Sequence, residues 1–343
     1  MLLLLLSPPA AAWAQEANTF AVDSRLVVVP VAVTDAKGKF IDGLTAADFT
    51  LLDNGRPREV QVDSWETGAA PISLVIAVQA SGISAAALEK IRKVGAMIQP
   101  LITGDRGCAA VVAFAAHVRW LQECTSDPAR IARALGSIQP GEPKVGRMLD
   151  AVDQGIARLK RRANSRRVLL LLSESRDRGS ETALELVIAD AQSASVTVYA
   201  ATYSAFKTAW TTRPSGDPPT PMPRGRRLPP TEENRPTILA PGQVPPPEQR
   251  AEIGGGLGEL KRLSEPETAK LLVEATGGAK FPFTRQRALE EAIEKLGAEL
   301  HSQYVLSFVP AEGTPPGFRN LEVRVKSKAY RVRARPGYWA IAP

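Results

Sequence analysis

Three uncharged, mostly apolar runs constrain the fold more than any other feature of the chain. They cover residues 72–78, 168–172 and 196–203. Runs of this kind are typical of strands that are buried on both faces of a parallel sheet. Segments with helical periodicity accompany them, at 85–102, 127–138, 147–161 and 181–195. Strands that alternate with helices predict an α/β fold with a doubly wound, mainly parallel sheet over residues 71–205.

Further structured segments flank this core. Pro30 interrupts a long apolar strand, which suggests an edge strand or a bulge, and Asp53-Asn54-Gly55 is a hairpin signal. Later segments carry a helical pattern and then alternate apolar with charged residues. We therefore expect a small N-terminal β-sandwich-like domain at 20–66. The α/β core would be completed at 259–310, and a half-buried β-hairpin would follow at 318–341.

Proline and glycine mark an insertion within the core. Residues 214–247 hold 12 of the 28 prolines of the chain, and four glycines follow between 254 and 258. These glycines match neither a phosphate-binding loop nor a dinucleotide fingerprint. Residues 206–258 are therefore predicted to be a disordered insertion that acts as a spacer, with a docking segment as the alternative.

The first residues have the character of an export signal. Residues 2–6 are all Leu, and Ala12-Trp13-Ala14 places small residues where a signal peptidase would cut. No basic residue precedes the short apolar run, as in a signal peptide that has lost its true start. We expect residues 1–14 to be such a signal peptide, with a frayed apolar terminus as the alternative. The mature chain would be secreted or periplasmic. The sequence has no run of ~18 apolar residues, so we predict no transmembrane segment.

Only two cysteines and two histidines occur, which argues against zinc sites, iron–sulfur clusters and a disulfide scaffold. A tight turn centred on Ala116 would pair the strands on either side of it and place Cys108 opposite Cys124. Directly opposed Cβ atoms lie ~4.5–5.5 Å apart, close to what a disulfide needs. We predict a disulfide in an oxidising compartment, with two buried free thiols as the alternative. His117 and His301 are expected to be exposed and share no ligand spacing.

The net charge of +7 comes largely from two basic segments, 158–167 and 319–335. Cations suit the end of a helix, and charges on a strand face prevent edge-to-edge pairing. We interpret both segments as solvated, with an anionic polymer, envelope lipid or acidic partner as the alternative. No feature indicates nucleic-acid binding.

Several short motifs, in this order, resemble the bacterial VWFA-related domain family, described mostly from acidobacteria, which has the von Willebrand factor type A (VWA) fold. The resemblance covers nearly the whole chain apart from the insertion. The motifs are Leu44-Thr45-Ala46-Ala47-Asp48-Phe49, Asp53-Asn54-Gly55, Pro71-Ile72-Ser73-Leu74-Val75, Ser81-Gly82, Phe114, Asp150-Ala151, Ala275-Thr276-Gly277-Gly278, Gln303-Tyr304-Val305-Leu306 and Val332-Arg333-Ala334-Arg335-Pro336-Gly337-Tyr338.

The resemblance implies a metal-ion-dependent adhesion site at the carboxyl edge of the sheet. Its ligands in the family are an Asp-x-Ser-x-Ser loop, a Thr and an Asp, which together hold Mg²⁺. Here Gln79, Ser81 and Ile83 fall on the first loop, Gly146 on the Thr and Glu174 on the Asp. Mg²⁺ needs carboxylate oxygens, so we expect a degenerate site with no metal and no cofactor. A rearranged site would use Ser84, Glu174 and Asp177.

The resemblance further implies a protein that binds other proteins. We expect an exported, non-enzymatic interaction or adhesion module, with an unknown protein partner that docks around Gln79–Ser84, Gly146 and Glu174. Association with the cell envelope is compatible with this role. One alternative is a Mg²⁺-dependent adhesin with the rearranged site. The other is a hydrolase, which is disfavoured because Ser81 has no evident base and no Gly-x-Ser-x-Gly or His-Glu-x-x-His motif occurs.

Overall fold

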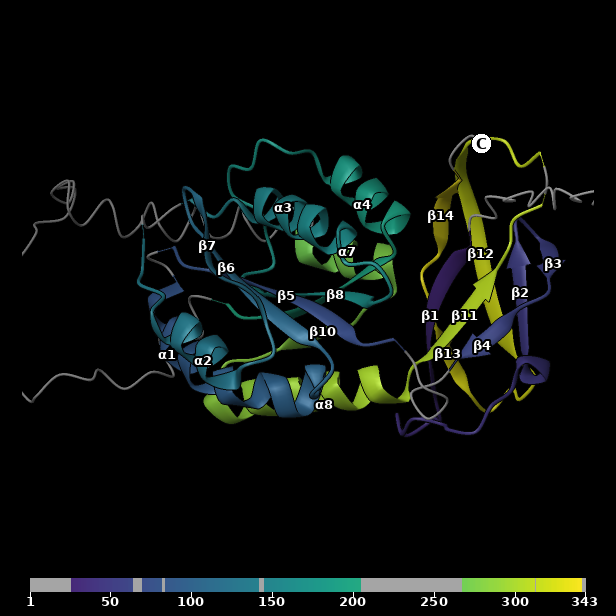
Figure 1. Ribbon diagram of the computed structural model, residues 1–343, viewed down its shortest axis with the longest axis horizontal. Coiled ribbons are helices and arrows are strands. Elements are labelled where there is room, and N and C mark those ends of the chain that lie inside the picture. Colours follow the sequence, from purple (N-terminus) through teal and green to yellow (C-terminus); the bar gives the residue numbers. More distant parts are fainter. Residues whose placement is uncertain are drawn as a thin grey trace, which may run out of the picture.

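The computed structural model describes residues 26–63, 70–81, 84–141, 145–204, 267–311 and 313–340. An α/β lobe and a lobe of β-strands lie side by side (Figure 1). The predicted signal peptide at 1–14 and the predicted insertion at 206–258 lie outside the described residues.

The sheet of the α/β lobe confirms the predicted fold class. Its six strands have the order β10-β9-β8-β5-β6-β7, and all neighbours are parallel except β6 with β7. All eight residues of the central strand β5 are buried, because helices cover both faces of the sheet. The strands are β5 (Ile72–Gln79), β6 (Cys108–Phe114), β7 (Val118–Thr125), β8 (Arg166–Ser173), β9 (Val196–Thr202) and β10 (Lys280–Pro282).

The helices divide between the two faces of this sheet (Figure 1). Leu74 and Ile76 of β5 belong to the core on one face, while Val75 and Ala77 belong to the core on the other. This division follows from the alternation of side chains along a strand. The first face carries α1 (Ala85–Ile91), α2 (Pro128–Gly136) and α8 (Gln286–Ser302), and the second carries α3 (Met148–Lys160), α4 (Leu184–Ser193) and α7 (Thr268–Thr276).

The segment 85–102 is not a single α-helix. After α1 the chain tightens into the 3-10 helix η3 (Arg92–Met97) and then widens into the π-helical turn η4 (Gln99–Thr103). A Cβ on Gly95 would lie 2.7 Å from the Cα atom of Ala132, so this segment packs closely on α2. The helical period predicted this segment but not the change of winding along it.

The second lobe is a β-sandwich that combines both ends of the described chain. Its two four-stranded sheets have the orders β13-β1-β11-β4 and β14-β12-β2-β3. Val29, Leu51 and Leu306 are fully buried between them. The 3-10 helix η1 (Ala46–Asp48) leads into β2. The strands are β1 (Val27–Thr34), β2 (Phe49–Asp53), β3 (Arg56–Arg58), β4 (Gln61–Asp63), β11 (Tyr304–Phe308), β12 (Gly317–Val325), β13 (Arg331–Arg333) and β14 (Gly337–Ala340).

The C-terminal strands pair differently from a simple two-stranded hairpin. Strand β12 pairs with β14 and β2, while β13 pairs with β1. Strand β11, expected to complete the α/β core, instead pairs with β1 and β4 of the sandwich. An alternating pattern specifies which face of a strand is buried and leaves its partner strand open.

The β6–β7 hairpin begins in the expected register, with Phe114 opposite Val118 and Val112 opposite Trp120. Two register shifts then move the strands, so Val111 lies opposite Gln122 and Ala109 opposite Thr125. Cys108 and Cys124 are therefore not directly opposed, yet they form a disulfide with their Cα atoms 5.3 Å apart.

The two basic segments are less solvated than expected. Arg166 is half-buried and donates to the carbonyl of Leu300 at 2.7 Å, and Arg335 is 4% exposed and donates to the carbonyl of Gln192. The sequence pattern could not show this, because the acceptors come from distant elements. His301 is also half-buried rather than exposed, with Nε2 3.2 Å from the carbonyl oxygen of Ile102. None of the described helices is both long and apolar enough to span a bilayer.

Candidate functional site

The candidate site lies at the carboxyl edge of the parallel sheet. Counted from β5, the strand order β7-β6-β5-β8-β9-β10 reads 3-2-1-4-5-6, in which the chain winds outward from β5 in one direction and from β8 in the other. Ligands of doubly wound sheets bind at this switch point, because the loops leave the two central strands in opposite directions. Gln79 ends β5 and Glu174 directly follows β8.

Three loops meet there. We call them the β5 loop, described at 80–81 and 84, the α3 loop, described at 145–147, and the β8 loop, residues 174–183. The predicted residues Gln79, Ser81, Ser84, Gly146 and Glu174 all lie on these loops or at their starts. Ile83, also predicted, lies outside the described residues.

The side chain of Gln79 joins the β5 loop to the β8 loop. Its Oε1 accepts a hydrogen bond of 2.9 Å from the backbone N–H of Glu174, and its Nε2 donates to Ser81 Oγ at 2.9 Å. Ser81 Oγ lies 3.0 Å from Ser84 Oγ. All three side chains are buried, so their polar atoms depend on these partners rather than on water.

Gly146 joins the α3 loop to the β8 loop through its backbone. It exchanges two hydrogen bonds of 3.0 Å with the backbone of Arg178. A Cβ on Gly146 would lie 3.0 Å from Gln79 Nε2. The missing side chain therefore leaves the space that the Gln79 amide occupies.

Glu174 holds the only negative charge among the predicted docking residues, and the structure pairs it with a residue that sequence reasoning missed. Arg178 Nη2 lies 2.7 Å from Glu174 Oε2, and the two side chains are 18% and 5% exposed. The spacing of four residues between them was the available signal, although the β8 loop is not a helix. Tyr203, also missed, lies beside this pair, and burial raises the pKa of its hydroxyl well above the ordinary value.

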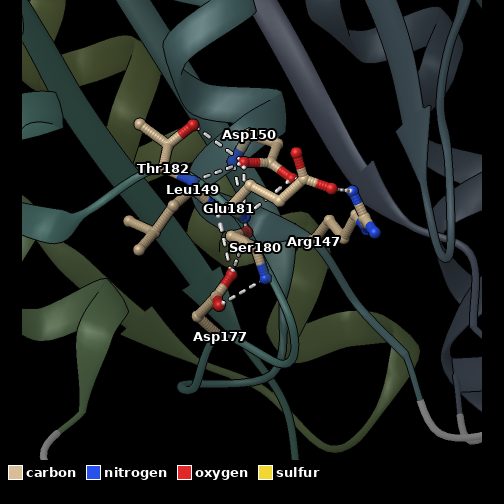
Figure 2. A network of polar contacts seen from close by, with 7 residues as sticks. All are labelled: Arg147, Leu149, Asp150, Asp177, Ser180, Glu181 and Thr182. Carbon is tan, nitrogen blue, oxygen red and sulfur yellow. Dashed lines mark hydrogen bonds and ion pairs between the residues drawn. The ribbon is translucent and has the colours of Figure 1, made fainter.

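Asp177, the third member of the alternative metal site, belongs to a separate network (Figure 2). Its Oδ1 accepts hydrogen bonds from the backbone N–H of Leu149 at 3.0 Å and from Ser180 Oγ at 2.6 Å, and its Oδ2 accepts one from the backbone N–H of Ser180. A carboxylate at the first turn of a helix satisfies free N–H groups and complements the helix dipole. Asp177 thus anchors the β8 loop to the start of α3.

Asp150 makes the reciprocal connection. Its Oδ1 accepts from the backbone N–H and the hydroxyl of Thr182, at 3.0 and 2.8 Å, and from the backbone N–H of Glu181. These hydrogen bonds lower the pKa of Asp150 against the opposing effect of burial, which is the largest single influence. Arg147 pairs with Glu181 at 2.7 Å (Figure 2). The network makes the α3 and β8 loops one connected unit.

These residues do not fit a Mg²⁺ ion, which prefers octahedral oxygen ligands that include carboxylates. Glu174 is the one carboxylate at the predicted positions and is paired with Arg178, while Gln79 Oε1 accepts from Glu174. Asp177 accepts hydrogen bonds from the backbone N–H of Leu149 and the hydroxyl of Ser180. Across the described part of the chain, no three His, Cys, Asp or Glu side chains cluster as metal ligands. The site is a closed set of hydrogen bonds and one ion pair.

Comparison with known proteins gives broad and distant similarity. A von Willebrand factor type A protein from Catenulispora acidiphila is 11% identical, with a TM-score of 0.45 over 94% of this chain and 75% of that chain. An aerotolerance-related membrane protein from Bacteroides fragilis is 13% identical, with a TM-score of 0.41 over 66% of this chain and 98% of that chain. Proximal thread matrix protein 1 from the mussel byssus is 12% identical, with a TM-score of 0.43 over 72% and 49%. No family model and no curated protein sequence matches the chain.

Proposed function

We propose that this chain is an exported interaction module of the VWFA-related type, which binds a protein partner at the carboxyl edge of its parallel sheet without a bridging metal ion. The partner contacts the surface formed by the β5, α3 and β8 loops. The role is non-enzymatic. The chain is secreted or periplasmic, and in either location a partner in the cell envelope is accessible to it.

The observation that carries this proposal is the connection of three loops at the switch point by direct bonds. The Gln79 side chain joins the β5 loop to the β8 loop. The hydrogen bonds between the backbones of Gly146 and Arg178 join the α3 loop to the β8 loop. Loops held in one conformation lose little entropy when a partner binds, which favours their use as a docking surface.

Two further observations support the remaining parts of the proposal. The hydroxyl of Ser81 is bonded to Gln79 and Ser84 rather than to a base that could activate it as a nucleophile. The disulfide between Cys108 and Cys124 suits an oxidising compartment, as expected for an exported chain.

Titration calorimetry with Mg²⁺ and Mn²⁺ tests the metal-independent part. We expect no binding heat for the wild-type chain. Micromolar binding of either ion would instead support the Mg²⁺-dependent adhesin with a rearranged site.

Capture from native envelope extract tests the docking surface. The wild-type chain is expected to retain the same partner with and without EDTA. Glu181→Trp places a bulky side chain at a position on the rim of the site that is 80% exposed, and should abolish retention. Glu322→Trp, at a position 55% exposed on the sandwich, is the matched control and should retain the partner. Equal retention by both variants would move the docking surface elsewhere, and loss in EDTA would reject metal independence.

A further inference from the structure

The charge of Arg178 lies where the site requires a cation. Glu174 is 4% exposed, and a buried carboxylate is costly unless an opposite charge or several hydrogen-bond donors compensate it. The guanidinium supplies this compensation at 2.7 Å from within the same loop. Its planar array of donors suits a carboxylate and keeps its charge at any physiological pH.

The backbone of Arg178 is fixed independently of its side chain. Two hydrogen bonds of 3.0 Å pair it with the backbone of Gly146. The α3 loop therefore fixes the backbone position from which the Arg178 side chain extends. The Gln79 amide holds the backbone of Glu174, because its Oε1 accepts a hydrogen bond from the Glu174 N–H. Both members of the ion pair are therefore held in place by neighbouring loops.

We infer that Arg178 is the built-in counter-ion of this site and the residue that excludes divalent cations from it. A metal ion approaching Glu174 would meet a like charge already in contact with the carboxylate, and would have to displace it. The inference rests on the proposed function for the place of the site, and adds which residue makes that site independent of metal.

The inference predicts that removing the guanidinium creates a response to metal. In Arg178→Ala, Glu174 loses this counter-ion, while Ser81 and Ser84 still carry hydroxyl oxygens on the β5 loop, which Gln79 joins to the backbone of Glu174. Added Mn²⁺ at about five times its dissociation constant should raise the Tm of this variant by about 2–4 °C. The wild-type chain and Arg178→Lys, which keeps the charge, should show no rise.

Arg147→Ala is the matched control, because it removes an arginine from the same edge whose partner Glu181 is 80% exposed. Its Tm should not respond to Mn²⁺. If Arg178→Ala and a second variant, Arg178→Gln, do not fold alone, refolding in Mn²⁺ becomes the measurement, and recovery of the native circular dichroism spectrum supports the inference.

The outcomes separate the two proposals. The counter-ion role is overturned if Mn²⁺ does not change the Tm of Arg178→Ala, or if neither variant recovers its native spectrum on refolding in Mn²⁺. Either result leaves the proposal of a metal-independent docking surface intact. A wild-type Tm that rises with Mn²⁺ overturns both.

Discussion

Gly146 shows how one residue can set the chemistry of a site. Threonine at this position would add a hydroxyl ligand of the kind the family resemblance implies, but the space is taken by the amide of Gln79. The two positions are therefore coupled: a side chain at 146 would press on the amide of Gln79, which joins the other two loops.

Gly146→Thr should destabilise the chain by about 1–3 kcal/mol, since its Cβ would lie 3.0 Å from Gln79 Nε2 and that buried amide is bonded at both ends. Urea unfolding measures the change. Gly136→Ala is the control, because nothing lies within 4 Å of its Cβ at the end of α2, and it should stabilise the chain by about 0.5–1 kcal/mol. A Gly146→Thr variant as stable as the wild type would show that the Gln79 amide is not held in place.

His301 makes stability depend on pH in a defined direction. Burial lowers its pKa below the ordinary value of about 6.5, with the hydrogen bond to Ile102 as a smaller opposing effect. Between the folded pKa and 6.5 the unfolded chain binds a proton that the folded chain does not, so stability falls as pH decreases through this window.

Substitution of the two histidines tests this effect. His301→Gln should remove the part of the stability loss that occurs just below pH ~6.5. His117→Gln should still show this loss of stability. Urea midpoints recorded across this range give the comparison, and an unchanged slope in His301→Gln would falsify the assignment.

At the scale of elements, the β6–β7 hairpin combines an irregular register with a covalent link. Strand β7 is the antiparallel edge of the main sheet and pairs with β6 alone. Cys124 lies within the second register shift, between Gln122 and Thr125, and Cys108 comes directly before Ala109, the partner of Thr125. The disulfide therefore secures the part of the edge strand that hydrogen bonds hold least regularly.

Breaking this link should cost about 3 kcal/mol, the value expected for a closed loop of roughly this length; the two cysteines are 16 residues apart. Unfolding in urea with and without dithiothreitol measures the cost. The double variant Cys108→Ser/Cys124→Ser should be equally destabilised and insensitive to dithiothreitol. A wild-type chain whose midpoint ignores the reductant would contradict a stabilising role.

For the whole molecule, buried polar contacts join the sandwich to the α/β lobe. Glu299 of α8 accepts a hydrogen bond of 2.7 Å from Tyr199 and pairs with Arg333 of β13. Arg335 reaches the carbonyl of Gln192 at the end of α4, and burial lowers the pKa of its guanidinium to about 10. The basic tail thus forms part of an interface within the molecule, and we expect the two lobes to unfold together.

Arg333→Met should lower stability by about 3 kcal/mol, because it leaves the carboxylate of Glu299 buried without its counter-ion. The double variant Glu299→Gln/Arg333→Met should recover most of the loss. Arg324→Met is the control, since both it and its partner Glu322 are exposed, and should leave the stability close to that of the wild type. Calorimetry also reports cooperativity, and a wild-type chain that unfolds in two separate transitions would contradict the joint unfolding of the lobes.

The sequence alone determined the α/β class and the central parallel strands, because burial on both faces leaves a local and continuous record in the residues of a strand. The family resemblance, rather than the residue pattern, implied that Gln79, Ser81, Ser84, Gly146 and Glu174 lie at one edge of the sheet. The helical period located the segment at 85–102 and did not reveal its three successive windings.

Only the tertiary structure decided which strands from distant parts of the chain pair and which charges meet. Strand β12 joins β2 from the other end of the chain, and Arg335 contacts Gln192 across 143 residues. The pattern of a half-buried strand is the same for any partner, and an arginine has the same sequence appearance whether it faces water or a buried carbonyl. The role of Arg178 belongs to this class, because it depends on three loops that the sheet brings together.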